Sequence, residues 1–381
     1  MTTRRAARGG RGRGRGSDAT AFSAADEGFM RRALELAERG RATARPNPVV
    51  GAVIVRGGRI IGEGYHRRAG QAHAEVNAIR SVRGSTRGAT LYVTLEPCCH
   101  VGRTGPCTEF VLAGGFTRVV VGCGDPNPLV DGGGITRLRR AGLRVDVGCL
   151  QRECREAIRA YAVWIRERRP LVTLKAAATL DGYIADGKPR DQRAPAFLTG
   201  REALRAAHEL RSAHDAVLVG AGTALADDPR LTVRLPGRKR GPAPRRVALA
   251  GKAGLPADLK MLSPEAPSEV IGDPDGSGRP PIAFVLEHLA RERDVQSLLV
   301  EGGATIHGAF IKSGFVDRVA LFVAPRLLGG GVPIARGADL ALGDALTLGP
   351  LTVRAVGEDL LITADVVPAK QPRSAQAKPD R

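Results

Sequence analysis

The stretch HAEVNAIRSVRGSTRGATLYVTLEPCC (residues 73–99) decides the fold of the first half of this chain. It predicts a helix over residues 74–82 and then a buried strand over residues 89–95. The sequence on both sides continues in the same rhythm, with helices expected over 23–39, 106–114 and 133–141 and strands over 49–55, 59–62, 118–122 and 143–147. Alternating helices and strands indicate an α/β layer fold.

Chemically reactive residues stand at both ends of this stretch. A catalytic zinc site needs three protein ligands and one open position, where the metal lowers the pKa of a water molecule. The signature of zinc nucleobase deaminases is H-x-E followed by P-C-x-x-C. Its first parts are matched by His73-Ala-Glu75 and Pro97-Cys98. Residue 101 is valine, so the second cysteine of the signature is displaced.

The candidate for the displaced ligand is Cys107, which we expect at the start of a helix, where the helix dipole favours a thiolate. Cys99 is closer, but neighbouring residues of an extended chain point to opposite sides, so one zinc ion does not easily take both Cys98 and Cys99. We therefore predict that His73, Cys98 and Cys107 bind Zn²⁺. The alternative is that His73 begins an ordinary helix and that the cysteines are core residues.

Glu75 is the predicted catalytic residue. It would take a proton from the attacking water and deliver it to the leaving nitrogen. Residues two apart in a regular helix diverge by about 200°. His73 and Glu75 therefore converge only if the site lies off the N-terminus of the helix. The chain has six cysteines, and three of them fall within ten residues, which favours metal binding over disulfides in a cytosolic protein.

The length of 381 residues favours two domains. The basic segment RERRP (166–170) follows a helical stretch over 150–167 and marks the boundary. We predict disordered tails over 1–22 and 368–381, a deaminase domain over 23–168 and a second domain over 169–367. In the second domain we expect strands over 171–175, 215–219, 245–250, 297–300, 317–324, 351–356 and 359–366, and helices over 200–212, 282–291 and 304–313.

The formal net charge of +19 suggests anionic partners. Six arginines precede the first acidic residue, Asp18, in a Gly/Arg tail. Such tails can bind RNA, although a solvated extension is the interpretation we favour. A phosphorylated substrate and a phosphorylated cofactor would explain part of the remaining charge. No run of about 18 apolar residues is present, and no apolar stretch follows the basic N-terminus, so we expect a cytoplasmic protein without a membrane partner.

Residues 24–165 closely resemble the deaminase half of the bifunctional riboflavin-biosynthesis deaminase/reductase family. The resemblance is carried by PNPVVGAVIV (46–55), GEGYHRRAGQAHAEVNAI (62–79), YVTLEPCCHVGRTGPC (92–107) and DPNPLVDGGGI (125–135). It implies a cytidine-deaminase-like three-layer domain, and its long loop between the two cysteines supports Cys107. The implied substrate is a diamino-ribosylamino-pyrimidinone 5′-phosphate, whose ring 2-amino group is hydrolysed. The implied substrate contacts are Asn47, His66, Arg103, Asp125 and Asn127, although His66 and Asn127 could instead cap turns.

Residues 171–366 resemble the reductase half of the same family, which implies a dihydrofolate-reductase-like α/β domain that uses NADPH to reduce the ribosyl group to a ribityl chain. The matching stretches include LKAAATLDGYIA (174–185) and LLVEGGATIHGAFIKSGFVDR (298–318). The resemblance implies substrate roles for Lys175, Arg211, Leu231, Arg234 and Glu301. It implies cofactor roles for Ala177, Phe197, Thr199, Thr223, Asp227, Gly303, Ala304, Thr305, Ile306, His307, Gly308 and Ala309.

Elementary chemistry supports part of this second set. Gly302-Gly303 lies between an expected strand and helix, so backbone amides at the helix start could hold a cofactor phosphate. Lys175 and Glu301 end predicted strands, where the sites of α/β proteins tend to lie. The alternative for the segment Asp227-Asp228-Pro229 is a simple turn.

The second half also departs from the family pattern. Pro195 replaces a serine expected to contact substrate, Phe197 replaces a tryptophan expected near the cofactor, and Ala250-Gly251 replaces Asp-Ser. The segment between Leu255 and Phe284 is short, so we expect one strand and one helix to be missing. Our hypothesis is that deamination is intact while reduction is impaired, altered or lost.

Two other function classes stay open at this point. A tRNA-editing deaminase would share the zinc chemistry and would suit the basic tail, but the long loop and the fused second half make a nucleic-acid substrate the less favoured interpretation. A non-catalytic binding role is an option for residues 171–366. Such fused enzymes often associate, so a homo-oligomer is possible.

Overall fold

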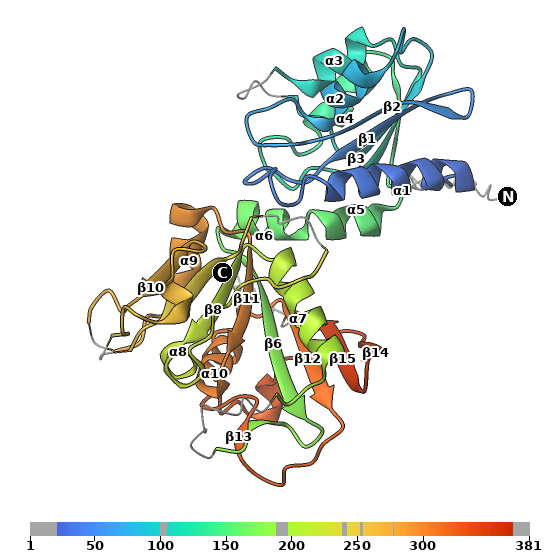
Figure 1. Ribbon diagram of the computed structural model, residues 1–381. Coiled ribbons are helices and arrows are strands. Elements are labelled where there is room, and N and C mark those ends of the chain that lie inside the picture. Colours follow the sequence, from blue (N-terminus) through green and yellow to red (C-terminus); the bar gives the residue numbers. More distant parts are fainter. Residues whose placement is uncertain are drawn as a thin grey trace, which may run out of the picture.

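The computed structural model describes residues 21–99, 105–187, 197–237, 242–251, 254–276 and 278–368. Two α/β domains lie end to end in this part of the chain, with helix α6 (Arg159–Glu167) at their junction (Figure 1). The predicted tails fall outside the described residues except for residues 21, 22 and 368, so their disorder stays a prediction. Within the described ranges, no helix has the length and apolar character needed to cross a membrane.

The first domain is built on a five-stranded sheet with the strand order β2-β1-β3-β4-β5. Its strands are β1 (Gly51–Arg56), β2 (Arg59–Tyr65), β3 (Thr90–Leu95), β4 (Arg118–Cys123) and β5 (Arg144–Val147). β1 is antiparallel to β2 and β3, whereas β3, β4 and β5 run parallel. The carboxyl ends of β3 and β4 therefore meet at one edge of the sheet, which is where α/β proteins place their sites.

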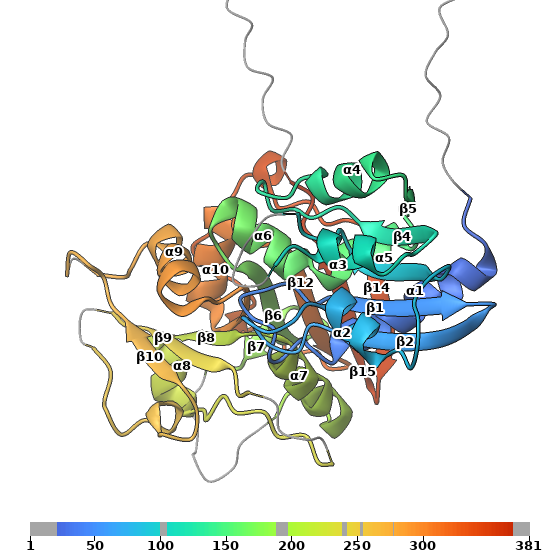
Figure 2. The same cartoon turned by 90° about the horizontal axis from the view of Figure 1, so that it is seen from above.

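Helices cover both faces of this sheet, as Figure 2 shows from above. One face carries α1 (Ala24–Glu38) and α5 (Gln151–Ala157), and the other carries α2 (Ala74–Ser81), α3 (Cys107–Ala113) and α4 (Gly133–Arg140). The alternation within β1 explains the three layers, because Val53 and Val55 pack on the α1 side while Ala52 and Ile54 pack on the α2 side.

The second domain has an eight-stranded sheet with the order β10-β9-β8-β11-β6-β12-β15-β14. Its first six strands run parallel to one another. β15 is antiparallel to both of its neighbours, β12 and β14. The bounds are β6 (Leu171–Thr179), β8 (Ala216–Gly220), β9 (Arg245–Leu249), β10 (Ser268–Ile271), β11 (Ser297–Gly302), β12 (Arg318–Ala324), β14 (Thr352–Val356) and β15 (Asp359–Asp365). A separate two-stranded sheet pairs β7 (Tyr183–Ala185) with β13 (Val332–Pro333).

Helices again cover both faces of the large sheet. α9 (Ile282–Arg293) and α10 (Ala304–Ser313) bury their apolar residues against one face. α7 (Arg201–Ala213), α8 (Ala221–Asp227) and the 3₁₀ turn η1 (Lys260–Leu262) pack on the other, and a second 3₁₀ turn, η2 (Leu342–Asp344), lies further along the chain. The expected α/β architecture of two fused domains is thus confirmed.

Several predicted elements need correction. The helical stretch 150–167 is two helices, α5 and α6, because the chain leaves helical geometry at Ile158. The strand predicted over 171–175 continues to Thr179. β12 pairs with residues 173–179 of this strand, while β11 pairs only as far as Leu174. The segment after Leu255 forms the 3₁₀ turn η1 and then β10, which is the edge strand of the sheet beside β9. The expected loss of one strand and one helix relative to the family stays a prediction.

A fully buried arginine explains how the shortened segment still closes the sheet. Arg246 on β9 donates to the Ser263 hydroxyl at 3.2 Å and to the carbonyls of Ser263 and Ala266. These bonds fold the chain after η1 back towards β9, so that β10 reaches the sheet edge. Short elements with little periodicity, namely β7, α8, β10 and β13, carry no pattern that sequence reasoning recognised.

Candidate active sites

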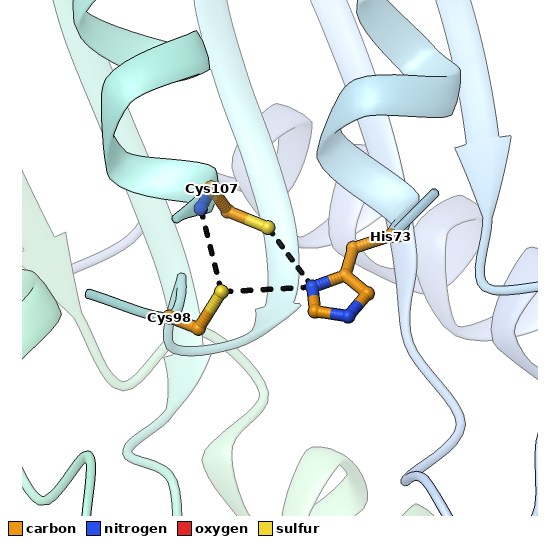
Figure 3. Close-up of side chains that lie close together, drawn as sticks. All are labelled: His73, Cys98 and Cys107. Carbon is orange, nitrogen blue, oxygen red and sulfur yellow. Dashed lines mark hydrogen bonds between the residues drawn. The ribbon is translucent and has the colours of Figure 1, made fainter. Parts of the chain in front are cut away.

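The three predicted zinc ligands converge on one point in the first domain (Figure 3). Their ligand atoms all lie within 4.8 Å of one another, and this is the only such group of histidine, cysteine or carboxylate residues found among the described residues. His73 Nδ1 lies 3.0 Å from the Cys107 sulfur and 3.6 Å from the Cys98 sulfur. The mixed set of one imidazole and two thiols is a ligand set that zinc prefers.

The local fold explains this convergence. His73 is the residue that caps the N-terminus of α2, and Cys107 is the first residue of α3. Cys98 lies just beyond the carboxyl end of β3, and its carbonyl accepts a hydrogen bond from the Thr108 amide at 3.2 Å. The site therefore lies off two helix N-termini, as the predicted convergence of His73 and Glu75 required.

Glu75, in the first turn of α2, is buried beside this cluster. Burial raises the pKa of the Glu75 carboxyl to about 7, well above its ordinary value. A carboxyl group with a pKa near neutrality can both accept and return a proton, which is what the predicted shuttle requires. The electrostatic environment thus suits the role that the sequence predicts.

A hydrogen bond between the two thiols shifts their pKa values in opposite directions. The hydrogen bond from the Cys107 thiol lowers the pKa of Cys98 to about 4, and the same bond raises the pKa of Cys107. The hydrogen bond with Cys98 also raises the pKa of His73. A metal with two thiolate ligands requires both thiols to lose their protons.

A pocket of about 370 Å³ opens beside the cluster and brings most of the predicted residues together. Glu75, His73 and Cys98 line it. Four predicted substrate contacts line it as well, namely Asn47, His66, Asp125 and Asn127. Arg103, the predicted phosphate contact, lies outside the described residues. The pocket lies at the carboxyl edge of β3 and β4, so the topology delivers these residues from five separate segments to one place.

His66 and Asn47 form a polar pair on the wall of this pocket. Asn47 Nδ2 lies 3.0 Å from His66 Nε2, and His66 Nδ1 lies 3.3 Å from the Ala72 carbonyl. Burial lowers the pKa of His66, so the ring is neutral, with Nδ1 donating to Ala72 and Nε2 accepting from Asn47. This arrangement leaves the Asn47 side-chain oxygen free to accept a bond from a ring amino group.

The opposite wall is the turn after β4. Asn127 accepts the Leu129 amide through its side chain at 3.0 Å, so it does cap a turn while it also lines the pocket. Buried Glu96 holds this turn, because its carboxylate accepts the backbone amides of Gly132 and Ile135 at 3.1 and 3.0 Å. Glu96 is thus a supporting residue that the sequence analysis did not single out.

Sequence reasoning also missed Tyr161, which reaches the pocket from α6. Its ring is buried, and burial raises the pKa of its hydroxyl. The only signal in the sequence was its place on the apolar face of the helical stretch before the domain boundary, which does not tell a core tyrosine from a pocket tyrosine.

A second, larger pocket of about 930 Å³ lies in the other domain, where β11 separates from β6. Buried Glu301 holds two cations there. The Arg211 guanidinium contacts both of its oxygens, one at 2.8 Å, and Lys175 Nζ lies 3.7 Å away. Burial opposes ionisation, yet Lys175 and Arg211 lower the pKa of Glu301 to about 2. Leu231 lines the same pocket.

Eight of the predicted cofactor residues also face this pocket. It is lined by Ala177, Thr223, Asp227, Gly303, Ala304, Thr305, Ile306 and His307. Gly303 has a positive φ of 86°, and a Cβ there would meet the Thr223 hydroxyl, so only glycine fits. Its position leaves the first amides of α10 facing the pocket, which is a suitable cradle for a phosphate of NADPH.

Some predicted residues do not line this pocket. Gly308 packs against the Arg336 carbonyl in the loop after β13, and Ala309 packs against the apolar core. Arg234 lines a neighbouring groove between the domains, with its Nε 3.4 Å from His208 Nε2. Phe197 is 58% exposed, and Thr199 is also outside the pocket lining. Pro195 lies outside the described residues.

Conversely, Arg279 and Arg336 line the pocket without a motif that marks them.

Comparison with known proteins agrees with both domains. Residues 23–123 match the cytidine and deoxycytidylate deaminase zinc-binding region, and residues 170–362 match the RibD C-terminal domain. The riboflavin biosynthesis protein RibD of Aquifex aeolicus is 39% identical over 88% of this chain and 97% of its own length. That of Escherichia coli strain K12 is 38% identical over 80% of this chain and 89% of its own.

The chain belongs to the RibD family. Solved structures agree in fold. Acinetobacter baumannii RibD superposes with a TM-score of 0.81 at 34% identity, covering 90% of this chain and 99% of that one. A Thermotoga maritima diaminohydroxyphosphoribosylaminopyrimidine deaminase/5-amino-6-(5-phosphoribosylamino)uracil reductase gives 0.80 at 36% identity, with the same coverage.

Membership of the RibD family confirms the expected activity. The chain is a deaminase fused to a reductase in riboflavin biosynthesis, with a zinc-binding deaminase domain and an NADPH-dependent reductase domain. One of the two pockets lies in each domain.

Proposed function

We propose that the pocket beside His73, Cys98 and Cys107 removes an amino group from a phosphorylated pyrimidine. The observation that carries this proposal is the buried Glu75 carboxyl, with a raised pKa, within a cluster of three zinc-type ligands. His73, Cys98 and Cys107 would hold zinc, which would lower the pKa of the attacking water towards neutrality. Glu75 accepts the proton of the attacking water and returns it to the departing amino group.

The polar residues of the same pocket orient the ring. The Asn47 amide oxygen accepts from an amino group of the pyrimidine, and neutral His66 keeps the Asn47 side chain in the required rotamer through its Nε2. Asp125 and Asn127 on the opposite wall contact the ribose end. A free nucleotide-sized substrate fits a pocket of about 370 Å³, which favours a small pyrimidine phosphate over a nucleic acid.

We propose that the second pocket reduces the ribosyl group of the deaminated product. The start of α10 would hold NADPH, which would supply the hydride. Lys175 and Arg211 present positive charge towards the substrate, and Glu301 fixes both side chains through the contacts described above. Because Glu301 stays ionised, the two cations are partly neutralised and can be buried without a large penalty.

A specific observation favours weak rather than absent cofactor binding. Gly303 and the first residues of α10 line the pocket, as cofactor binding there requires. Gly251, however, brings no side chain to the pocket at the position where the resemblance implies a serine. We therefore propose that reduction proceeds with a raised KM for NADPH.

A two-step assay tests both proposals. Purified protein receives the pyrimidine phosphate, and ammonia release and NADPH oxidation are followed separately. Ammonia release without NADPH, followed by NADPH oxidation only after deamination, is the expected result. Deamination of tRNA but not of the free pyrimidine phosphate would refute the substrate class, and saturation at ordinary NADPH concentrations would refute the weakened cofactor site.

A further inference from the structure

One wall of the deaminase pocket is held from the other domain. The loop Arg45–Pro48 connects the end of α1 to β1 and carries Asn47 into the pocket. Arg45 and Pro46, the two residues before Asn47, contact the reductase domain. The Arg45 guanidinium forms an ion pair with Asp215, and the Pro46 carbonyl accepts a hydrogen bond from Gln296 Nε2.

The reductase residues that make these contacts are rigidly placed. Asp215 is buried just before β8, and its carboxylate also accepts the amides of Gln296 and Ser297 at 2.8 and 3.1 Å. Gln296 is buried immediately before β11. Burial lowers the pKa of Arg45 to about 10, so its charge persists at neutral pH and needs the partner carboxylate. The loop is thus fixed to the amino ends of two parallel strands.

The opposite wall of the pocket is connected to the same domain through α6. Arg166 Nε donates to the Pro126 carbonyl, in the turn between Asp125 and Asn127, at 3.0 Å. From the same helix, Trp164 Nε1 donates to the Ala290 carbonyl of α9 at 3.1 Å. Both walls that carry proposed substrate contacts therefore depend on contacts that reach the reductase domain.

We propose that Asp215 and Gln296, in the reductase domain, are positioning residues for the deamination reaction. They act through Arg45 and Pro46 to set the position of Asn47, and they do not contact the substrate themselves. This inference rests on the proposed role of Asn47 in the pocket. It predicts a change in substrate binding rather than in the chemical step, because Glu75 and the three metal ligands lie on elements that these contacts do not touch.

The reductase site provides an internal control. Gln296 precedes β11, whereas Glu301 lies near the carboxyl end of that strand, four residues of extended chain beyond its first residue. Loss of the Gln296 side-chain bond therefore leaves the reductase pocket unchanged. A general loss of folding would instead lower both activities together.

The test compares variants of the full-length zinc-loaded protein. Gln296→Met removes the donor to Pro46 and keeps the length of the side chain, and Asp215→Asn removes the charge opposite Arg45. Glu156→Gln is the matched control, because it breaks the Arg318 contact of 2.7 Å across the same boundary without touching either pocket loop. Asn47→Ala tests the pocket assignment. Steady-state ammonia release gives KM and kcat, and NADPH oxidation with deaminated substrate gives the reductase rate.

We expect Gln296→Met to raise the KM for deamination roughly three- to tenfold, the usual effect of one lost hydrogen bond, with kcat and the reductase rate nearly unchanged. Asp215→Asn should raise KM further, and Glu156→Gln should leave it unchanged. If Asp215→Asn does not fold, Gln296→Met still decides the question.

The contrary outcomes are distinct. An unchanged KM in Gln296→Met together with a raised KM in Asn47→Ala overturns the inference alone. An unchanged KM in Asn47→Ala overturns the pocket assignment on which the inference rests. An equal rise in KM for Glu156→Gln, or parallel losses of both activities in Gln296→Met, shows a general effect of the interface and also overturns it.

Discussion

Replacement of Glu75 by glutamine separates the catalytic role of this residue from its structural role. Glu75 is completely buried, and glutamine keeps its size but cannot carry the proton. The rate of deamination should fall by about 10²- to 10⁴-fold, the usual contribution of a positioned acid–base group. Zinc content should stay the same, because His73, Cys98 and Cys107 supply the ligands.

The same substitution should stabilise the metal-free protein. The folded-state pKa of Glu75 is about 7, above the ordinary value of 4.5, so ionisation opposes folding. The metal-free protein therefore keeps its full stability below the unfolded-state pKa of Glu75. It loses part of that stability as the pH rises through the folded-state pKa of Glu75. At about pH 8 the ionised carboxyl destabilises the fold by about 3 kcal/mol, and glutamine does not carry this penalty.

Three measurements on one preparation check this reasoning. Ammonia release reports the chemistry, atomic absorption reports the zinc content, and thermal unfolding after chelation reports the stability at low and high pH. Glu109→Gln, an exposed carboxylate that pairs with Arg137 on the surface, is the matched control and should change none of them. Near-normal turnover in Glu75→Gln would refute the shuttle, loss of zinc would make Glu75 a ligand, and a lower unfolding temperature at high pH would refute the burial argument.

Three further predictions follow from the described contacts. Removal of zinc by a chelator should abolish ammonia release and leave NADPH oxidation of deaminated substrate intact, and a parallel loss of both would contradict the separation of the two sites. Gly251→Ser should lower the KM for NADPH severalfold, because nothing lies within 4 Å of a Cβ built there; an unchanged or higher KM would count against the proposed cofactor wall. Arg118→Met should destabilise the fold by about 3–5 kcal/mol in urea unfolding, because it leaves Asp26 and Asp146 without their shared partner; a change under 1 kcal/mol would refute this. In the wild type, Arg118 lowers the pKa of both carboxyls against the opposing effect of burial, so this stability is present above their ordinary pKa of 3.8 and is lost as the pH falls below it.

The sequence alone determined the zinc cluster and the sheet that holds it. His73, Glu75, Cys98 and Cys107 follow a local logic, because each stands at the end of a helix or strand whose apolar periodicity is strong. Adjacent parallel strands then bring those ends to one edge of the sheet, and the family resemblance supported Cys107 as the second cysteine ligand. The valine at position 101 was enough to exclude a short cysteine spacing.

Elements with short or irregular patterns could not be predicted in this way. β10 has four residues, and it joins the sheet because buried Arg246 binds the carbonyls of a loop that is distant along the chain. The extension of β6 beyond Lys175 to Thr179 depends on its pairing with β12, whereas its pairing with β11 ends at Leu174. Helix and strand propensities of a short stretch of sequence carry no information about these contacts.

Only the tertiary structure shows which residues of the second half contact the loop that carries Asn47. Asp215 and Gln296 have no motif, and the sequence offered no reason to link them with that loop. Their roles arise from contacts between segments as much as 250 positions apart. Sequence patterns report the periodicity of one segment and the chemistry of its side chains, whereas the meeting of distant segments is settled by packing of whole sheets and helices, and that is where the two domains of this chain become one enzyme.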